Sequence, residues 1–167
     1  MVNAGMLQRA WQLPPREWAG LGWAYLALLR VDLLLRLRGF RNVARLDRQP
    51  EDDSSLDLTR AQRERVARYV RWIRVAAQYH VVRARCLHRS LALHQVLLRE
   101  GLPAQLRIGV RLQASELQAH AWVELGGIVV NDSREHVARF APLQGLDSAS
   151  PSRTGIALIS AGRGWTA

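Results

Sequence analysis

The hydrophobic pattern of the chain changes its period at Gly101-Leu102-Pro103, and this change constrains the fold more than any other feature. Up to Glu100, apolar residues recur at steps of three and four, which is typical of amphipathic helices. From Ala104 onward, apolar and polar residues alternate, which is typical of half-buried strands. Helices followed by a run of strands indicate an α+β fold, because a parallel sheet would require the two to alternate.

Three helices are expected in the first hundred residues. The first covers 13–40 and ends at Gly39, because glycine is common directly after a helix. The second begins after Thr59, whose side chain can cap it, and the third runs from Cys86 to about Glu100. Helical spacing predicts that four leucines of the first helix share one face: Leu26, Leu29, Leu33 and Leu37.

Three antiparallel strands are expected after the third helix. The glycines Gly126 and Gly127 favour a tight hairpin turn, because glycine adopts positive φ without steric cost. The segment 115–118 is expected to form a turn between the first two strands. The predicted strands cover 104–112, 119–125 and 128–132.

The length of 167 residues suits one domain with a hydrophobic core. A loop is expected over 41–59, which holds a proline, an acidic cluster and two serines. We therefore separate an N-terminal helical region, 1–58, from a core region, 59–143. The tail, 144–167, is rich in small residues, and its segment 156–159 is a candidate edge strand.

Charge and cysteine content limit the class of protein. The net charge of +10 would suit an acidic peptide, a nucleic acid or an anionic membrane as partner, and equally a solvated arginine-rich surface. One cysteine excludes an internal disulfide and predicts a cytoplasmic protein. Arg30 and Asp32 interrupt the apolar run of the first helix, so no stable membrane insertion is expected, although the helix could lie on a membrane surface.

Cys86 begins the third predicted helix, a position that suits a reactive thiol. Unpaired backbone N–H groups and the positive end of the helix dipole favour the thiolate there, and Arg83, Arg85 and Arg89 act in the same direction. The thiolate is the nucleophilic form of cysteine, and the same N–H groups can stabilise an oxyanion. These features make Cys86 a candidate catalytic nucleophile.

His120 and Asp132 are expected at the same end of the second hairpin. Symmetric pairing about the two glycines places residue 120 opposite 133 and residue 121 opposite 132, so that His120 and Asp132 are diagonal neighbours. A carboxylate at this position can hold the imidazole in one tautomer and leave the other ring nitrogen as a base for a thiol. Together with Cys86, the two residues form a candidate triad.

Each of these residues also has an ordinary structural explanation. A cysteine on an apolar helix can simply be buried, a histidine beside Trp122 can be a packed ring, and Asp132 can form a turn. A metal site is a further alternative, because His80, His88 and His94 lie near the cysteine. One cysteine with scattered histidines lacks the paired spacing of a zinc site, so neither a metal nor another cofactor is expected.

Two motifs carry a resemblance to a known family. The first is RCLHRSLALHQVLLREGLPAQLRIGV at 85–110, and the second is HAWVELGGIVVND at 120–132. Both resemble the leader peptidases of lasso peptide biosynthesis, which are transglutaminase-like members of the papain-type cysteine enzymes. The resemblance extends over about 13–135 and includes the LPPREW segment at its start.

The resemblance implies a helical N-terminal half followed by a core of helix and antiparallel sheet. It implies a cysteine peptidase that removes the leader from a ribosomally made lasso peptide precursor. Cys86 would be the nucleophile, His120 the general base and then acid, and Asp132 the orienting carboxylate. In supporting roles, Gln78 or Arg83 would assist the backbone N–H of Cys86 in binding the oxyanion, and Trp122 would pack beneath the site.

The resemblance also implies partners. The enzyme would act on the leader region of the precursor, delivered by a separate leader-recognition protein that docks on the helical region 1–58. An ATP-dependent lasso cyclase would then use the amine that cleavage exposes.

Two other functions stay open at this point. The same triad would serve a transglutaminase-type acyl transferase, in which an amine replaces water as the acceptor. The arginine excess would suit a non-catalytic nucleic-acid-binding domain. Because the arginines are scattered and no aromatic stacking platform is evident, a nucleic acid partner is not expected.

Overall fold

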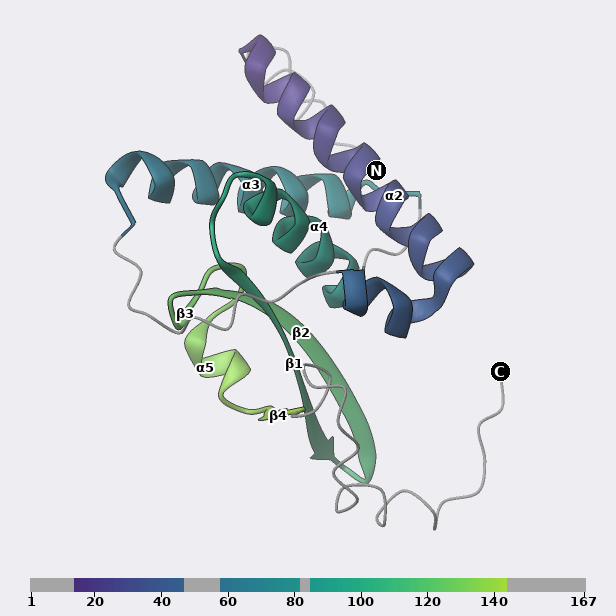
Figure 1. The fold of residues 1–167 in the computed structure, drawn as a ribbon. Coiled ribbons are helices and arrows are strands. Elements are labelled where there is room, and N and C mark those ends of the chain that lie inside the picture. The colour runs from purple at the N-terminus through teal and green to yellow at the C-terminus, as the bar shows by residue number, and fades with distance from the viewer. Residues whose placement is uncertain (1–13, 47–57, 82–84, 144–167) are drawn as a thin grey trace, which may run out of the picture.

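The structure is a computed structural model that describes residues 14–46, 58–81 and 85–143, with the backbone alone over 40–46 (Figure 1). Helices precede an antiparallel sheet of strand order β3-β2-β1-β4, which confirms the α+β prediction. Figure 1 shows α2, α3 and α4 gathered on one side, with the long β1–β2 hairpin extending away from them and α5 beside the sheet. The elements are α2 (Pro15–Leu46), α3 (Arg60–Gln78), α4 (Cys86–Arg99), β1 (Ala104–Gln113), β2 (Glu116–Leu125), β3 (Ile128–Val129), α5 (Arg134–Val137) and β4 (Ala141–Pro142).

The long helix α2 is interrupted at Gly39, where φ is 70° and ψ is 158°. The expected end of the first helix is therefore confirmed, but helical backbone resumes and continues to Leu46. The prediction of a loop from residue 41 is wrong for 41–46. The physical reason is that this segment contains neither proline nor a further glycine, so nothing in it opposes a helix before Pro50.

The four leucines of α2 do share a face, and that face is exposed to solvent, with 41 to 73% of each residue accessible. The opposite face, with Ala24, Leu28 and Val31, is buried in the core. The Pro15–Gly39 part of α2 is long and apolar enough to cross a membrane by length and composition, and 28% of its most apolar stretch is buried inside the protein. The helix thus contributes one side to the core and presents an apolar strip on the other.

Helix α3 begins where the sequence predicts. Thr59 and Gln62 form a capping box, in which the Thr59 hydroxyl accepts from Gln62 N–H and the Gln62 side chain accepts from Thr59 N–H. Such a box satisfies two N–H groups that would otherwise have no partner and contributes about 1 kcal/mol to the helix. On the other side of α3, Arg71 and Trp72 both donate to the carboxylate of Glu17 and thereby join α3 to α2.

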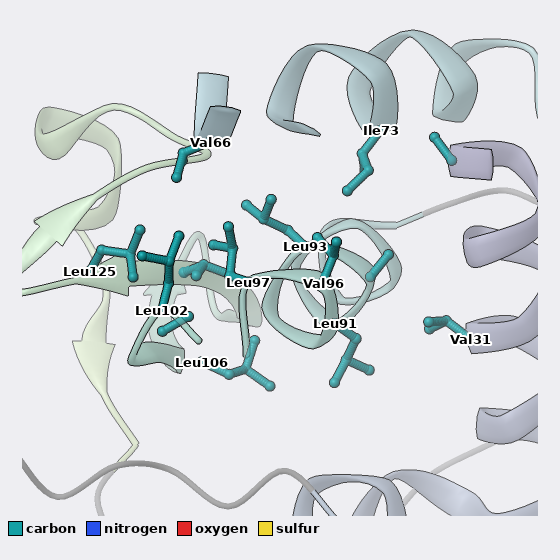
Figure 2. Close-up of a cluster of buried hydrophobic side chains, with 14 of the residues drawn as sticks. Val31, Val66, Ile73, Leu91, Leu93, Val96, Leu97, Leu102, Leu106 and Leu125 are labelled. Atoms are coloured by element: carbon teal, nitrogen blue, oxygen red, sulfur yellow. The ribbon is translucent and has the colours of Figure 1, made fainter. Parts of the chain in front are cut away.

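Helix α4 lies at the centre of the core (Figure 2). Leu91, Leu93 and Leu97 are fully buried, as the apolar pattern predicts. Around them lie side chains from α2, α3 and the sheet, among them Val31, Ile73, Leu106 and Leu125. Full burial of a leucine contributes about 1.5–3 kcal/mol, so α4 is held firmly and its first residue, Cys86, is held with it.

The two hairpin turns of the sheet differ from each other in how well the sequence predicts them. Gly126 and Gly127 have φ of 52° and 74°, which confirms the expected tight turn. The first turn is formed by Ala114 and Ser115, with φ of 50° and 68°, so the turn predicted over 115–118 is confirmed at Ser115 and wrong for 116–118. Residues 116–118 belong to β2, because the strand pairing overrides the turn tendency of a polar segment that contains no glycine.

The third predicted strand, 128–132, is also corrected. The strand β3 covers Ile128–Val129, and one further backbone bond joins Val130 N–H to the Val123 carbonyl of β2. The chain then turns into α5, which the sequence analysis did not predict. The candidate edge strand 156–159 lies outside the described residues. In the described sheet, the edge strand beside β1 is β4, which pairs with Gly109 and Val110.

Candidate functional site

Cys86 is the first residue of α4, as predicted, and it is half-buried. One helical turn later, the buried hydroxyl of Ser90 donates to the carbonyl of Ala121 at 2.8 Å. This bond fixes the first turns of α4 against β2, immediately beside His120. Within the described residues the Cys86 thiol forms no hydrogen bond. The bond between Ser90 and Ala121 therefore holds the first turn of α4 against the strand of His120, although the Cys86 and His120 side chains are not hydrogen-bonded to each other.

His120 and Asp132 form the short contact that the hairpin predicts. Nε2 of His120 lies 2.6 Å from Oδ2 of Asp132, and the two side chains are only 11% and 23% exposed. A carboxylate accepts hydrogen bonds, so Nε2 carries the proton and Nδ1 keeps its lone pair in the neutral ring. The carboxylate thereby selects the tautomer whose free nitrogen can act as a base.

Asp132 is held in its ionised form by several donors. Burial raises the pKa of its carboxyl, but hydrogen bonds from Ser133 N–H, His120 and His136 outweigh burial and hold the pKa below its usual value. Ser133 N–H lies 2.7 Å from Oδ1, and Nδ1 of His136 lies 3.1 Å from both oxygens. Two imidazoles therefore share one carboxylate, and His136 is a site residue that the sequence analysis missed.

Aromatic rings enclose the imidazole of His120. The ring of Trp122 lies nearly parallel to it at 6.1 Å between centroids, and the rings of His136 and Phe140 lie at 4.8 and 5.1 Å. Trp122 is buried and packs against the site as predicted, and its indole N–H donates to Glu124 at 2.7 Å. The ring of His120 is thus fixed by packing as well as by hydrogen bonding.

Asn131 connects the loop of Asp132 to the two elements behind it. Its side-chain oxygen accepts from Val123 N–H at 2.8 Å, and its side-chain nitrogen donates to Ser90 at 2.9 Å. The amide thus takes over the pairing with β2 where the backbone of β3 has ended, and it ties Asp132 to the helix of Cys86. The sequence analysis placed the Asn131-Asp132 pair at the end of a strand, and no sequence pattern indicated that the Asn131 side chain replaces a backbone acceptor.

Of the two side chains predicted to bind the oxyanion, the structure describes Gln78 alone. Gln78 is the last residue of α3, its side chain is exposed, and no hydrogen bond joins it to the three triad candidates. Arg83 lies outside the described residues. The proposed oxyanion roles of both side chains stay predictions.

The histidines considered as metal ligands each have a separate partner. Nε2 of His88 lies 3.3 Å from Asp32, that of His94 lies 2.9 Å from the Ala104 carbonyl, and that of His80 lies 3.2 Å from a carbonyl of α2. Among the described residues, the donor atoms of one other group, His120, Asp132 and His136, lie within 4.8 Å of one another and could hold a metal ion. The hydrogen bonds from His120 and His136 to Asp132 also explain why these atoms lie so near to one another, without a metal ion.

A groove of about 470 Å³ opens beside the carboxylate of Asp132. It lies between α3, the first half of α4 and the segment 130–133. A groove of this size next to a positioned acid and base can accept a segment of an extended peptide. Its lining residues are Val70, Ile73, Arg74, Arg89, Leu93, Val130, Asn131, Asp132 and Ser133.

Comparison with known proteins places the chain in a family. Part of the chain is 41% identical over 54 residues to the microcin J25-processing protein McjB of Escherichia coli, a match that covers 32% of this chain and 25% of that protein. No solved structure matches the chain significantly. The profile of the Transglutaminase-like superfamily matches residues 27–145, which is more than half of the chain and includes every candidate site residue. The chain belongs to the Transglutaminase-like superfamily.

Proposed function

We propose that this protein is a cysteine peptidase that removes the leader from a lasso peptide precursor. Family membership supports a thiol-based acyl transfer, and the partial match to a microcin-processing protein supports a peptide precursor as the substrate. The observation that carries the proposal is the 2.6 Å bond between His120 and Asp132, formed beside the helix that begins with Cys86.

In the proposed reaction, His120 Nδ1 accepts the thiol proton and the Cys86 sulfur attacks the carbonyl carbon at the leader–core junction. Backbone N–H groups at the start of α4 stabilise the oxyanion, because the first N–H groups of a helix have no internal partner. The C–N bond breaks as His120 gives its proton to the leaving core amine. Water, deprotonated by His120, then releases the leader from the thioester as a carboxylic acid.

Asp132 orients His120 and stabilises the imidazolium that forms in each step. Its low pKa keeps it ionised at neutral pH, so it remains an acceptor throughout the cycle. His136 donates to the same carboxylate and limits its rotation.

We place this reaction in the cytoplasm, with a separate leader-recognition protein that delivers the precursor. An ATP-dependent cyclase would then use the core amine. Reconstitution with and without a recognition protein would test this order, because cleavage should become faster when the leader is delivered.

The test of the proposed function is Cys86→Ala in the full chain, with cleavage of the precursor followed by mass spectrometry. Cleavage is expected to be lost while the thermal midpoint stays within a few degrees of the wild type, since the side chain is half-buried and makes no hydrogen bond to a residue that the structure describes. Cleavage that persists in this variant would overturn the proposal.

A second function, transfer of the acyl group to an amine, is favoured by the family to which the chain belongs. The product distinguishes the two reactions. Hydrolysis leaves a free carboxylate on the leader, whereas transfer leaves an amide whose mass includes the added amine.

A further inference from the structure

The groove beside Asp132 combines apolar walls with two cations. Arg74 comes from the later turns of α3, and Arg89 comes from the first turn of α4, three residues after Cys86. Aliphatic side chains separate them and complete the walls: Val70, Ile73, Leu93 and Val130. The groove therefore offers a place for a carboxylate next to places for aliphatic groups.

Neither arginine has a carboxylate partner among the residues that the structure describes. Arg71, one helical turn before Arg74, is by contrast bound to Glu17 at 2.6 Å, and Arg107 is bound to Glu124 at 3.2 Å. Arg89 is also half-buried as a residue, and no ion pair with a described residue compensates its charge. An anion that enters the groove would supply the missing interaction.

The stability of α4 does not explain these charges. The first turn of a helix prefers acidic residues, because its N–H groups carry partial positive charge. The first turn of α4 contains no acidic residue, and Arg85 occupies its N-cap without a side-chain capping bond. The local positive potential is thus unfavourable for the helix and favourable for binding an anion.

We propose that this groove binds a carboxylate of the peptide substrate, with Arg74 and Arg89 as its specificity-determining residues. The inference rests on the proposed function, since it names the chemistry of the peptide that occupies the site. Guanidinium and carboxylate form strong charge-assisted hydrogen bonds, and the aliphatic walls accept a neighbouring apolar side chain. Asp132 opposes this binding only weakly, because two histidines and Ser133 N–H already satisfy it.

The carboxylate can come from an acidic side chain or from the C-terminus of a peptide. The experiment separates the two sources. Immobilised full-length protein carrying Cys86→Ala, which binds without turnover, is incubated with a randomised library of short peptides that end in an amide. A second library has the same sequences with a free C-terminal carboxylate, and bound peptides are identified by mass spectrometry.

Enrichment of Asp and Glu at one position of the amidated library is expected for a side-chain ligand. Enrichment that appears only in the second library would identify a terminal carboxylate. For the best peptide, replacing its acid by the amide, or replacing one of the two arginines by Gln, should weaken binding about tenfold. Arg74→Gln with Arg89→Gln should abolish the preference.

Arg99→Gln is the matched control. It removes the same charge from the same helix, and Arg99 lines a different, smaller pocket with Arg30. Equal binding of the acidic and amide peptides, or a preference that survives the double variant, would overturn the inference. Thermal melts of each variant confirm that loss of preference is not loss of fold.

Two further measurements separate this role from others. If Arg89 served only the thiol, Arg89→Gln would slow alkylation by neutral iodoacetamide and leave the peptide preference intact, which would contradict the inference. Because binding needs no turnover, loss of peptidase activity with a retained preference would affect only the proposed function. Cleavage of peptides without a carboxylate preference would affect only this inference.

Discussion

Two carboxylates illustrate how the halves of this protein differ. Glu17 of α2 and Asp132 near the sheet both have side chains that are largely shielded, at 11% and 23% exposed, and both have lowered pKa values. Glu17 is held by the indole of Trp72 and the guanidinium of Arg71, neither of which gives up a proton at physiological pH. Asp132 is held by two imidazoles, a kind of side chain that can accept and return a proton at its second ring nitrogen.

The difference teaches that donor chemistry, rather than burial or pKa direction, separates a structural carboxylate from a candidate catalytic one. The Trp72 hydrogen bond is the main cause that lowers the pKa of Glu17, against the effect of burial, and the charge of Arg71 adds to it. That site fastens α2 to α3. At Asp132 the same kind of bonding leaves a titratable ring nitrogen available, so a proton can move there.

The largest expected effect is that of His120→Ala. Loss of a general base and acid lowers kcat/KM by roughly 10²–10⁴-fold, whereas the fold should keep most of its stability because the surrounding rings remain. Precursor cleavage and a urea unfolding curve on the same sample measure the two quantities. Activity within tenfold of wild type would remove His120 from the mechanism.

The paired substitutions Asp132→Asn and Glu17→Gln test the comparison directly. Asp132→Asn disturbs the tautomer and the charge beside His120, so we expect a loss of roughly 10²-fold in kcat. Glu17→Gln should leave kcat unchanged and lower the urea midpoint, because it weakens the bonds to Arg71 and Trp72. The reverse outcome for either variant would show that the two carboxylates have been assigned to the wrong roles.

Asn131→Ala tests the connection between the two elements of the site. The change leaves Val123 N–H without its acceptor and removes the donor to the Ser90 hydroxyl, which keeps its own bond to the Ala121 carbonyl. Loss of the acceptor costs about 1–3 kcal/mol of unfolding free energy. It should also lower kcat, because it releases the Asp132 segment from α4. Ser133→Ala is a nearby control that removes only the N-cap bond of α5, at about 1 kcal/mol.

Two glycines offer a second matched pair. A Cβ at Gly109 would lie 2.8 Å from Phe140 Cβ and 2.9 Å from the Trp122 ring, and one at Gly20 would collide with the Trp72 ring. Each alanine variant should lose about 1–3 kcal/mol through overpacking. Only Gly109→Ala should also reduce kcat, because Trp122 and Phe140 hold the ring of His120. An equal loss of kcat in the two variants would contradict the assignment of a catalytic role to the region around Gly109 and a structural role to the region around Gly20.

The smallest expected effect is on stability in acid. The pKa values of Glu17 and Asp132 lie below the ordinary values of 4.5 and 3.8, so each ionised carboxylate stabilises the fold above that value. This contribution is lost as the pH falls through the lower folded-state pKa. Calorimetry at decreasing pH, starting from pH 7, should show that the thermal unfolding midpoint falls less below about pH 4.5 in Glu17→Gln than in the wild type. Glu135→Gln, an exposed carboxylate, should follow the wild-type curve.

The sequence predicted local structure best at positions where the residue type itself explains the conformation, such as a helix cap or a glycine with positive φ. The Thr59 cap, the stops at Gly39 and Gly101 and the Gly126-Gly127 turn were predictable, because caps and positive φ angles depend on a few neighbouring atoms. The sequence predicted the structure least well where a side chain takes the place of a backbone hydrogen-bond acceptor. The end of β3 at Val129 follows from the Asn131 side chain taking the place of a backbone acceptor, which no local pattern reveals.

Local chemistry by itself determined the order of the elements from α2 to β3, the helix-initial position of Cys86 and the approach of His120 to Asp132 across a hairpin. Only the tertiary structure decided that Asn131 ties this pair to α4, that His136 shares the carboxylate, and that the α2 leucines face solvent. The physical reason is the separation along the sequence of the residues that interact. Periodicity and turns arise from interactions within a few residues, whereas burial and hydrogen-bond partners depend on segments that meet only when the chain has folded.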